Sequence, residues 1–167
     1  IQNADDAGAS EIHFILDERR HKDERVFNDQ SKHMQGPALC VYNDKSFAPA
    51  DYEGLQNLGI GSKRTSEETI GKFGIGFNTV YSVTDTPMFV SNNDLVILDP
   101  HREFVPCAEV GNPGGKFPLT QDFVNSYSDI VNAFNLHETV NVNMNTGTLF
   151  RLPLRCEFDS EIVGVRR

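Results

Sequence analysis

Glycine is concentrated in one short stretch of the chain, and this concentration limits what its middle can fold into. Of the 13 glycines, five lie in this stretch, at positions 59, 61, 71, 74 and 76. The residues from 62 to 69 are all polar, so they form neither an amphipathic helix nor a half-buried strand. The pattern predicts an exposed loop over 59–73 with a glycine hinge at each end.

Two glycines flank a single residue at Gly74-Ile75-Gly76, immediately before a predicted helix over 77–83. Without Cβ atoms, the backbone N–H groups of such a turn can approach an anion closely, and a helix start adds positive potential. The same pattern also fits a tight junction between a loop and a helix that binds nothing. Both interpretations stay open on these residues alone.

The known phosphate motifs do not fit this glycine cluster. A dinucleotide fingerprint needs a third glycine where Thr79 stands, and Gly115-Lys116-Phe117 lacks the hydroxyl residue of a P-loop. A nucleotide bound by this chain would therefore need a different architecture.

Strand and helix patterns alternate along the chain without an internal repeat. The predicted first strand, 11–17, has Ile12, Phe14 and Leu16 on one face and His13 and Ile15 on the other. Asn92-Asn93 is predicted to join two strands in a hairpin. Further strands are expected at 38–42, 88–90, 95–98 and 148–154, and helices at 1–7, 50–58, 77–83 and 122–134. This order predicts an α+β two-layer sandwich, with a mixed, mostly antiparallel sheet covered by helices on one face.

Length and charge bound the possible functions. The 167 residues suit one domain, expected over 1–155, with 156–167 beginning a following segment and the first helix cut at its start. With 24 acidic against 15 basic residues and a net charge of -9, we expect no nucleic-acid partner. No apolar run approaches a membrane span, so no membrane partner is expected either.

Cysteine and histidine usage bears on compartment and metal content. The three cysteines are widely spaced, which argues against a disulfide framework and favours a reducing, cytoplasmic location. The five histidines and three cysteines show no ligand spacing, so a zinc site is not expected.

Three stretches of the chain resemble the nucleotide pocket of the GHKL (Bergerat-fold) ATPases. They are IQNADDAG (1–8), IGKFGIGF (70–77) and TGTLFRL (146–152). Within that superfamily, QGPALCVYND, GKFGIGFNTVYSVTD and LDPH are very similar to the sacsin-type chaperone-like repeats, which are related to the N-terminal domain of ninety-kilodalton heat-shock chaperones. The resemblance covers about residues 1–155. It implies a Bergerat ATP-binding fold, ATP and Mg²⁺ as cofactors, and client or co-chaperone proteins as partners.

The resemblance also implies roles for individual residues. Asn3 matches the Mg²⁺-binding asparagine, and Asp6, on the same helical face, would orient Asn3 or a water, or else be a solvated helix-end carboxylate. The remaining matches are Asn57 before the lid, Lys63 toward the phosphates, Gly74, Gly76 and Phe77 in the glycine box, and Thr148 in the adenine network.

Two features depart from the superfamily pattern. The general-base glutamate is expected four residues before Asn3, upstream of Ile1, so the catalytic residue is unknown and this chain is expected to hydrolyse ATP poorly. The adenine-binding Asp-x-Gly-x-Gly box is replaced by a segment without glycine, where Asn43, or Asp44 after a one-residue shift, would accept from adenine. A neutral amide accepts more weakly than a carboxylate.

Three functions remain open at this point. The chain is an ATP-binding chaperone module, or an interaction scaffold with a vestigial pocket that does not depend on nucleotide. A phosphotransferase like the histidine kinases is disfavoured, because no helical-hairpin histidine module is present.

Overall fold

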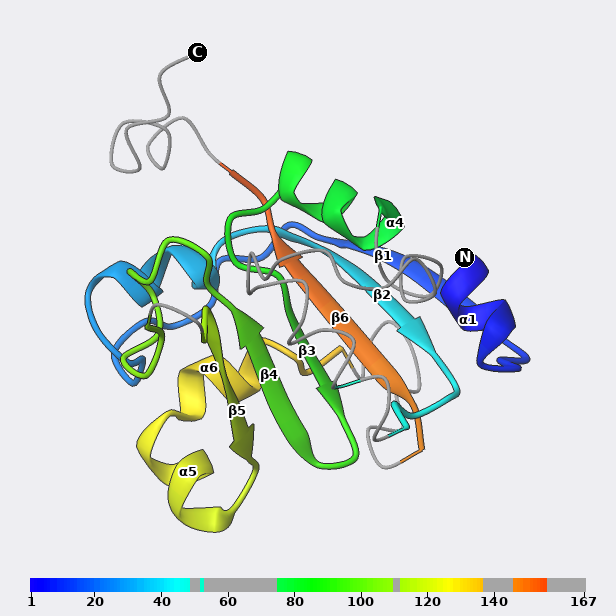
Figure 1. Cartoon of the computed structure of the whole chain (residues 1–167). Coiled ribbons are helices and arrows are strands. Elements are labelled where there is room, and N and C mark those ends of the chain that lie inside the picture. Colours follow the sequence, from blue (N-terminus) through cyan, green and yellow to red (C-terminus); the bar gives the residue numbers. More distant parts are fainter. Residues whose placement is uncertain (49–51, 53–74, 110–111, 137–145, 156–167) are drawn as a thin grey trace.

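A six-stranded antiparallel sheet organises the computed structural model, which describes residues 1–48, 52, 75–109, 112–136 and 146–155 (Figure 1). The strand order is β1-β2-β6-β3-β4-β5. The strands are β1 (Ile12–Asp17), β2 (Ala38–Asn43), β3 (Met88–Ser91), β4 (Asp94–Leu98), β5 (Gly114–Pro118) and β6 (Thr148–Pro153). The α+β class is confirmed. Every pairing among the described strands is antiparallel, so the mixed sheet we expected is not found there.

The last described strand, β6, lies between β2 and β3, which come much earlier in the chain. Thr148 is opposite Asn43 on one side and Ser91 on the other. Residues separated by about a hundred positions therefore meet at one end of the sheet. The β3–β4 hairpin turns at Asn92 and Asn93, whose φ angles are 52° and 62°, as expected for a tight turn that matches strand twist.

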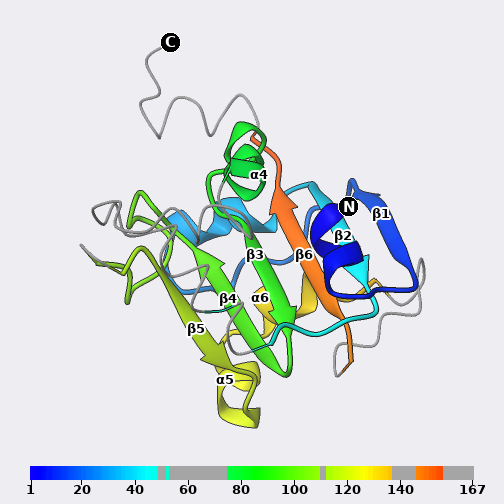
Figure 2. The same cartoon turned by 45° about the vertical axis from the view of Figure 1, so that its right-hand side comes forward.

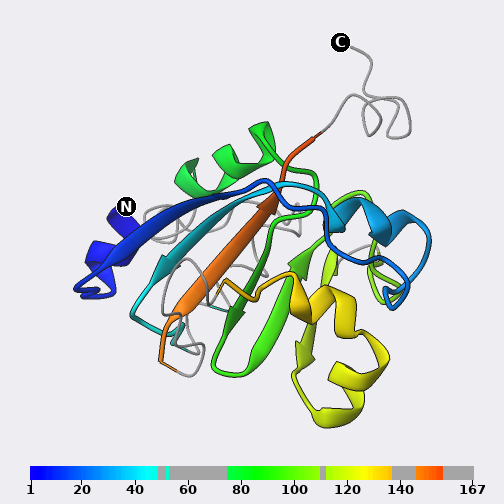
Figure 3. The same ribbon diagram turned by 180° about the vertical axis from the view of Figure 1, so that it is seen from behind.

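Helices lie on both faces of the sheet, which corrects the expectation of helices on one face. Figure 2 shows α1 in front of β2 and β6, whereas Figure 3 shows α5 and α6 in front of the opposite face. The helices among the described residues are α1 (Gln2–Asp6), α4 (Ile75–Asn78), α5 (Gln121–Ser126) and α6 (Ser128–Asn132), with 3₁₀ turns η1 (Gln30–Gln35) and η2 (Thr79–Ser82).

The two helical layers follow from strands that are apolar on both sides. On the α6 face, Met88 and Leu95 pack with Ile130 and Phe134 in the larger core. The intervening residues Phe89 and Val96 point the other way, toward α4, because successive side chains alternate between faces. A strand without a polar face must be covered on both sides.

The edge strand β1 departs from the expected burial. Ile15 and Asp17 are buried, whereas Phe14 is 57% and Leu16 is 60% exposed. The face with more apolar residues is therefore the exposed one. Pairing with β2 turns Ile15 into the larger core, and sequence alternation alone does not indicate which face meets that core.

Two predicted helices differ in detail from the structure. The helix expected over 122–134 is divided at Tyr127 (φ -124°, ψ 41°) into α5 and α6. The helix expected over 77–83 is one short α-helical turn followed by a 3₁₀ turn. The helix over 50–58, apart from Tyr52, and the loop over 59–73 lie outside the described residues.

A fully buried arginine joins β6 to β1 through the larger core. Arg151 donates from Nη1 to Asp17 Oδ2 at 2.8 Å and from Nη2 to the Gly36 carbonyl at 2.6 Å. Asp17 also accepts from Arg19 Nε at 2.7 Å and lies 2.9 Å from His21 Nε2. Burying a charge is costly unless it is paired and hydrogen-bonded, so this carboxylate has to remain in place for Arg151 to be tolerated.

We predict that Asp17→Ala destabilises the fold strongly, because it leaves the buried Arg151 charge without its partner. The expected loss in the free energy of unfolding is about 3–5 kcal/mol, measured by urea denaturation at neutral pH. The control is Asp29→Ala, which removes an exposed carboxylate 2.9 Å from Lys32 and should have little effect. Equal losses in the two variants would contradict the assigned role.

The same cluster predicts a pH dependence. Burial by itself raises the pKa of Asp17, but hydrogen bonds from Arg19 and His21 and the charge of Arg151 outweigh it and hold the pKa well below the ordinary 3.8. Its stabilisation is therefore complete above that ordinary value and is lost as pH falls below it. Urea titrations between about pH 2 and 4 should show a shallower pH slope in Asp17→Asn than in the parent. Identical slopes would show that another carboxyl controls the acid limb.

Candidate functional site

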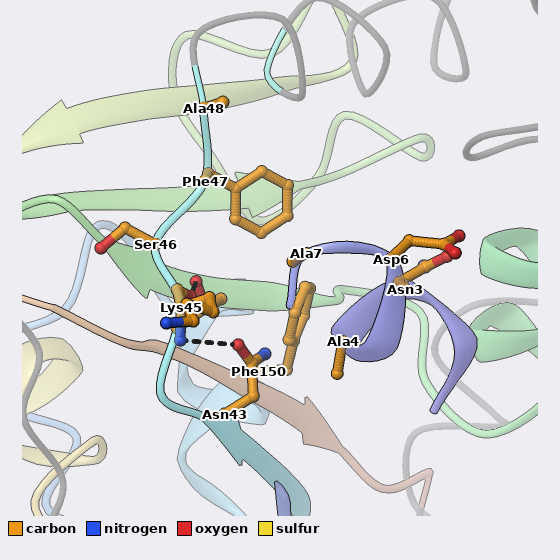
Figure 4. A pocket seen from close by; sticks show the side chains of 11 residues that line it. Asn3, Ala4, Asp6, Ala7, Asn43, Lys45, Ser46, Phe47, Ala48 and Phe150 are labelled. Atoms are coloured by element: carbon orange, nitrogen blue, oxygen red, sulfur yellow. Dashed lines mark hydrogen bonds between the residues drawn. The ribbon is translucent and has the colours of Figure 1, made fainter. Parts of the chain in front are cut away.

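A pocket of about 310 Å³ lies between α1 and the segment that follows β2 (Figure 4). Its apolar lining comes from Ala4, Ala7, Phe47, Ala48 and Phe150. Its polar lining comes from Asn3, Asp6, Asn43, Lys45, Ser46 and Thr148. The volume is at the lower end of the range for small-molecule sites. Three parts of the chain that are far apart in sequence therefore form one hollow.

Helix α1 places two oxygen-bearing side chains at one end of this pocket. Asn3 and Asp6 are three residues apart, lie side by side in Figure 4 and are exposed, whereas Ala4 is buried and faces the fold. Gly8, at φ +70°, follows the C-cap residue Ala7, and the Gly8 N–H donates to the Asp5 carbonyl at 2.8 Å. Amide and carboxylate oxygens are suitable ligands for Mg²⁺.

The opposite end of the pocket is formed by the ends of β2 and β6. Asn43 Oδ1 accepts from the Lys45 backbone N–H at 3.0 Å, and Thr148 Oγ1 donates to the Lys45 carbonyl at 2.7 Å. Both bonds hold the backbone of Lys45 against the strand ends. Asn43 and Thr148 thus lie close together, as the sequence resemblance implied. Their side chains, however, are already hydrogen-bonded to the backbone of Lys45.

Hydrogen bonds from the β3–β4 hairpin hold the same segment further along. Phe47 N–H donates to Ser91 Oγ at 3.0 Å, and Asn92 Nδ2 donates to the Phe47 carbonyl at 2.6 Å. Ser91 Oγ lies 2.9 Å from Thr148 Oγ1. The segment 45–47 is therefore fixed by three different strands before any ligand enters.

Asp44 faces away from the pocket and is not part of its lining. Its carboxylate accepts from the Ser10 backbone N–H at 2.8 Å, from the Ser10 hydroxyl and from the Glu11 N–H at 3.3 Å. Hydrogen bonds from the Ser10 hydroxyl and backbone lower the pKa of Asp44. Of the two acceptor candidates named from the sequence, Asn43 is the one that borders the pocket.

The glycine-box residues are only partly described. Phe77 is buried outside the pocket lining, and its ring centroid lies 6.1 Å from that of Phe150. Gly76 lies within α4. Asn57, Lys63 and Gly74 lie outside the described residues, so their predicted roles stay predictions.

Sequence reasoning missed the residues from Lys45 to Ala48 and also Phe150. Phe150 had a usable signal, because residues two apart in a strand share a face and Thr148 was already a candidate. At Gly147 the backbone passes close to β2, because a Cβ there would lie 2.5 Å from the Tyr42 ring and 2.6 Å from the Asn43 carbonyl. No local pattern marks the segment after β2, which has neither glycine nor an apolar period.

Two features are absent from the described part of the chain. No helix there is long and apolar enough to cross a membrane. Within the same residues, no group of three or more His, Cys, Asp or Glu side chains is arranged to hold a metal ion.

We predict that Thr148→Val destabilises the fold while preserving the shape of the side chain. The change leaves the Lys45 carbonyl without its donor and Ser91 Oγ without its neighbour. A loss of about 1–3 kcal/mol in the free energy of unfolding is expected, measured by urea denaturation. As a control, Ser82→Ala removes an exposed hydroxyl that donates to the Thr79 carbonyl at 2.7 Å and should cost less. A neutral Thr148→Val would show that the wall is not held by this hydroxyl.

Comparison with known proteins places this geometry in a family. The model of the Sacsin domain family matches residues 1–164. The chain is 45% identical over 157 residues to Sacsin of Homo sapiens. This alignment covers 93% of this chain and 3% of that protein. It is 30% identical over 90 residues to Protein NO VEIN of Arabidopsis thaliana, and this alignment covers 50% of this chain and 3% of that protein. The chain thus spans a small part of the length of these relatives, and it belongs to the Sacsin domain family.

Proposed function

We propose that this chain is a nucleotide-binding module of a larger sacsin-like protein. Its ligand is a magnesium-bound purine nucleoside triphosphate, and ATP is the one that the sequence resemblance implies. One observation carries the proposal: Asn3 and Asp6 share a pocket with Asn43 and Thr148. The sequence resemblance implies that these residues lie at the two ends of one bound nucleotide. By the same argument, we propose that the fold is of the Bergerat type.

The chemistry of the pocket supports this assignment. Asn3 and Asp6 offer one amide and one carboxylate oxygen, and Mg²⁺ typically keeps several waters and needs few protein ligands. The metal would neutralise phosphate charge beside the acidic helix. The flat walls of Phe47 and Phe150 suit a base, since aromatic faces stack on ring systems.

What the module does for the whole protein is also part of the proposal. By resemblance, nucleotide occupancy would alter how neighbouring segments pack, and so serve chaperone work on client or co-chaperone proteins. Hydrolysis of the bound nucleotide would need a general base. A positioned base typically contributes about 10²–10⁴-fold in rate, and the resemblance places that base before Ile1.

A second candidate function is a scaffold that needs no nucleotide. It is favoured by the hydrogen bonds of the wall itself: Asn43 Oδ1 and the Thr148 hydroxyl are both engaged with Lys45. A pocket whose polar groups bind each other can be a relic. Direct binding measurements separate the two functions.

We predict that calorimetric titration of this chain detects ATP or GTP with a dissociation constant in the millimolar range or tighter, and that Mg²⁺ improves it. Asn3→Ala should reduce the improvement by Mg²⁺ about tenfold, because it removes a ligand oxygen.

The matched control is Gln2→Ala, an exposed α1 residue outside the pocket lining, which should behave like the parent. Absence of binding by both nucleotides would overturn the proposed function and favour the scaffold. A metal dependence that survives intact in Asn3→Ala would overturn the role of Asn3 alone.

A further inference from the structure

The side-chain amide of Asn43 has a fixed orientation. Its Oδ1 accepts from the backbone N–H of Lys45 at 3.0 Å, the bond that is dashed in Figure 4. A backbone N–H can only donate, so the oxygen must face Lys45 and the NH₂ group must be the other end. No acceptor for this NH₂ group is found among the described residues, and Asn43 borders the pocket. The amide therefore presents a donor to the pocket.

The other polar side chains at this end offer at most one open acceptor position, the second lone pair of Thr148 Oγ1. Thr148 gives its hydroxyl hydrogen to the Lys45 carbonyl at 2.7 Å. With that hydrogen used, the 2.9 Å contact between Ser91 Oγ and Thr148 Oγ1 needs the Ser91 hydroxyl as donor. The Lys45 ammonium can only donate, and Figure 4 shows the Ser46 side chain directed away from α1.

The pocket thus has opposite polarity at its two ends. Asn3 and Asp6 supply oxygen ligands on α1, and the strand-end wall supplies an N–H donor beside Phe150. If the metal and phosphates occupy the α1 end, the base lies at the wall. In a purine, the substituent at position 6 lies on the edge far from the sugar, so it is the group that meets Asn43.

We propose that this pocket prefers purine nucleotides with a carbonyl oxygen at position 6, such as inosine and guanosine nucleotides, over those with an amino group there. The inference rests on the proposed function, because it concerns the base of the same bound nucleotide. A 6-oxo group accepts from Asn43 Nδ2. A 6-amino group would place a donor against the Asn43 donor and leave the Asn43 NH₂ group unpaired, and polar sites discriminate strongly against ligands that leave their groups unpaired.

Calorimetric titration with Mg-ITP and Mg-ATP tests the preference, because these two ligands differ only in the position-6 group and its neighbouring ring proton. We expect ITP to bind about five to ten times more tightly than ATP in the parent chain, with GTP following ITP. Asn43→Asp should reverse the order. It keeps an oxygen for the Lys45 N–H and turns the pocket-facing NH₂ into an acceptor of the same shape.

Asp44→Asn is the matched control, since it makes the opposite change on the adjacent residue, whose side chain binds Ser10 outside the pocket. It should leave the preference for ITP unchanged. If Asn43→Asp does not fold, judged by circular dichroism, Asn43→Ala replaces it and should bring ITP and ATP to equal affinity.

The outcomes separate the two proposals. Equal affinities for ITP and ATP in the parent, or tighter ATP, would overturn the base preference while nucleotide binding stands. Absence of binding by ITP, GTP and ATP alike would overturn both. A preference for ITP that persists in Asn43→Asp would show that another group selects the base, and would overturn the role of Asn43.

Discussion

Backbone pairing of β6 with both β2 and β3 is the constraint on which the rest of the structure depends. It brings Thr148 opposite Asn43 and Ser91, and it brings Arg151 opposite Cys40 and Met88. Because neighbouring residues of a strand face opposite sides, the same six residues serve two purposes. Arg151 pairs with Asp17 in the larger core, whereas Thr148 and Phe150 face the pocket. Stability and site are therefore coupled through one central strand, and a shift of its register by one residue would exchange the two faces.

Local patterns predicted the elements better than they predicted the faces of those elements. The alternation in 12–17, the asparagine turn at 92–93 and the α+β class were all readable from the sequence. The layering was not, because Phe89 and Val96 look like ordinary core residues until α4 is seen to cover them. The buried Arg151 was also unpredictable, since its partner Asp17 is 134 positions away. Tertiary pairing of this kind leaves no periodic signal.

The site shows the same division. Resemblance to known motifs named Asn3, Asp6, Asn43 and Thr148, and the fold brings all four to one pocket. It also named Asp44, whose carboxylate is held by Ser10 instead, and Phe77, which lies behind Phe150 in the aromatic cluster. The segment from Lys45 to Ala48 went unnamed because it is held by hydrogen bonds to its backbone, which any residue type can make. Sequence patterns reflect side chains, whereas residues 45–47 are held in this wall through their backbone groups.

The hydrogen bonds to the backbone of residues 45–47 affect both how rigid this wall is and which polar atoms it exposes. If a ligand binds as proposed, having Lys45 and Phe47 already fixed would reduce the entropy lost on binding. One of these hydrogen bonds directs the Asn43 oxygen toward the Lys45 N–H, so the amide nitrogen is the other end of the side chain. A carboxylate at position 43 would hold the loop equally well and still offer an acceptor. Asparagine at position 43 therefore still supports the segment after β2, and it differs from a carboxylate in carrying an NH₂ donor in place of a second acceptor oxygen.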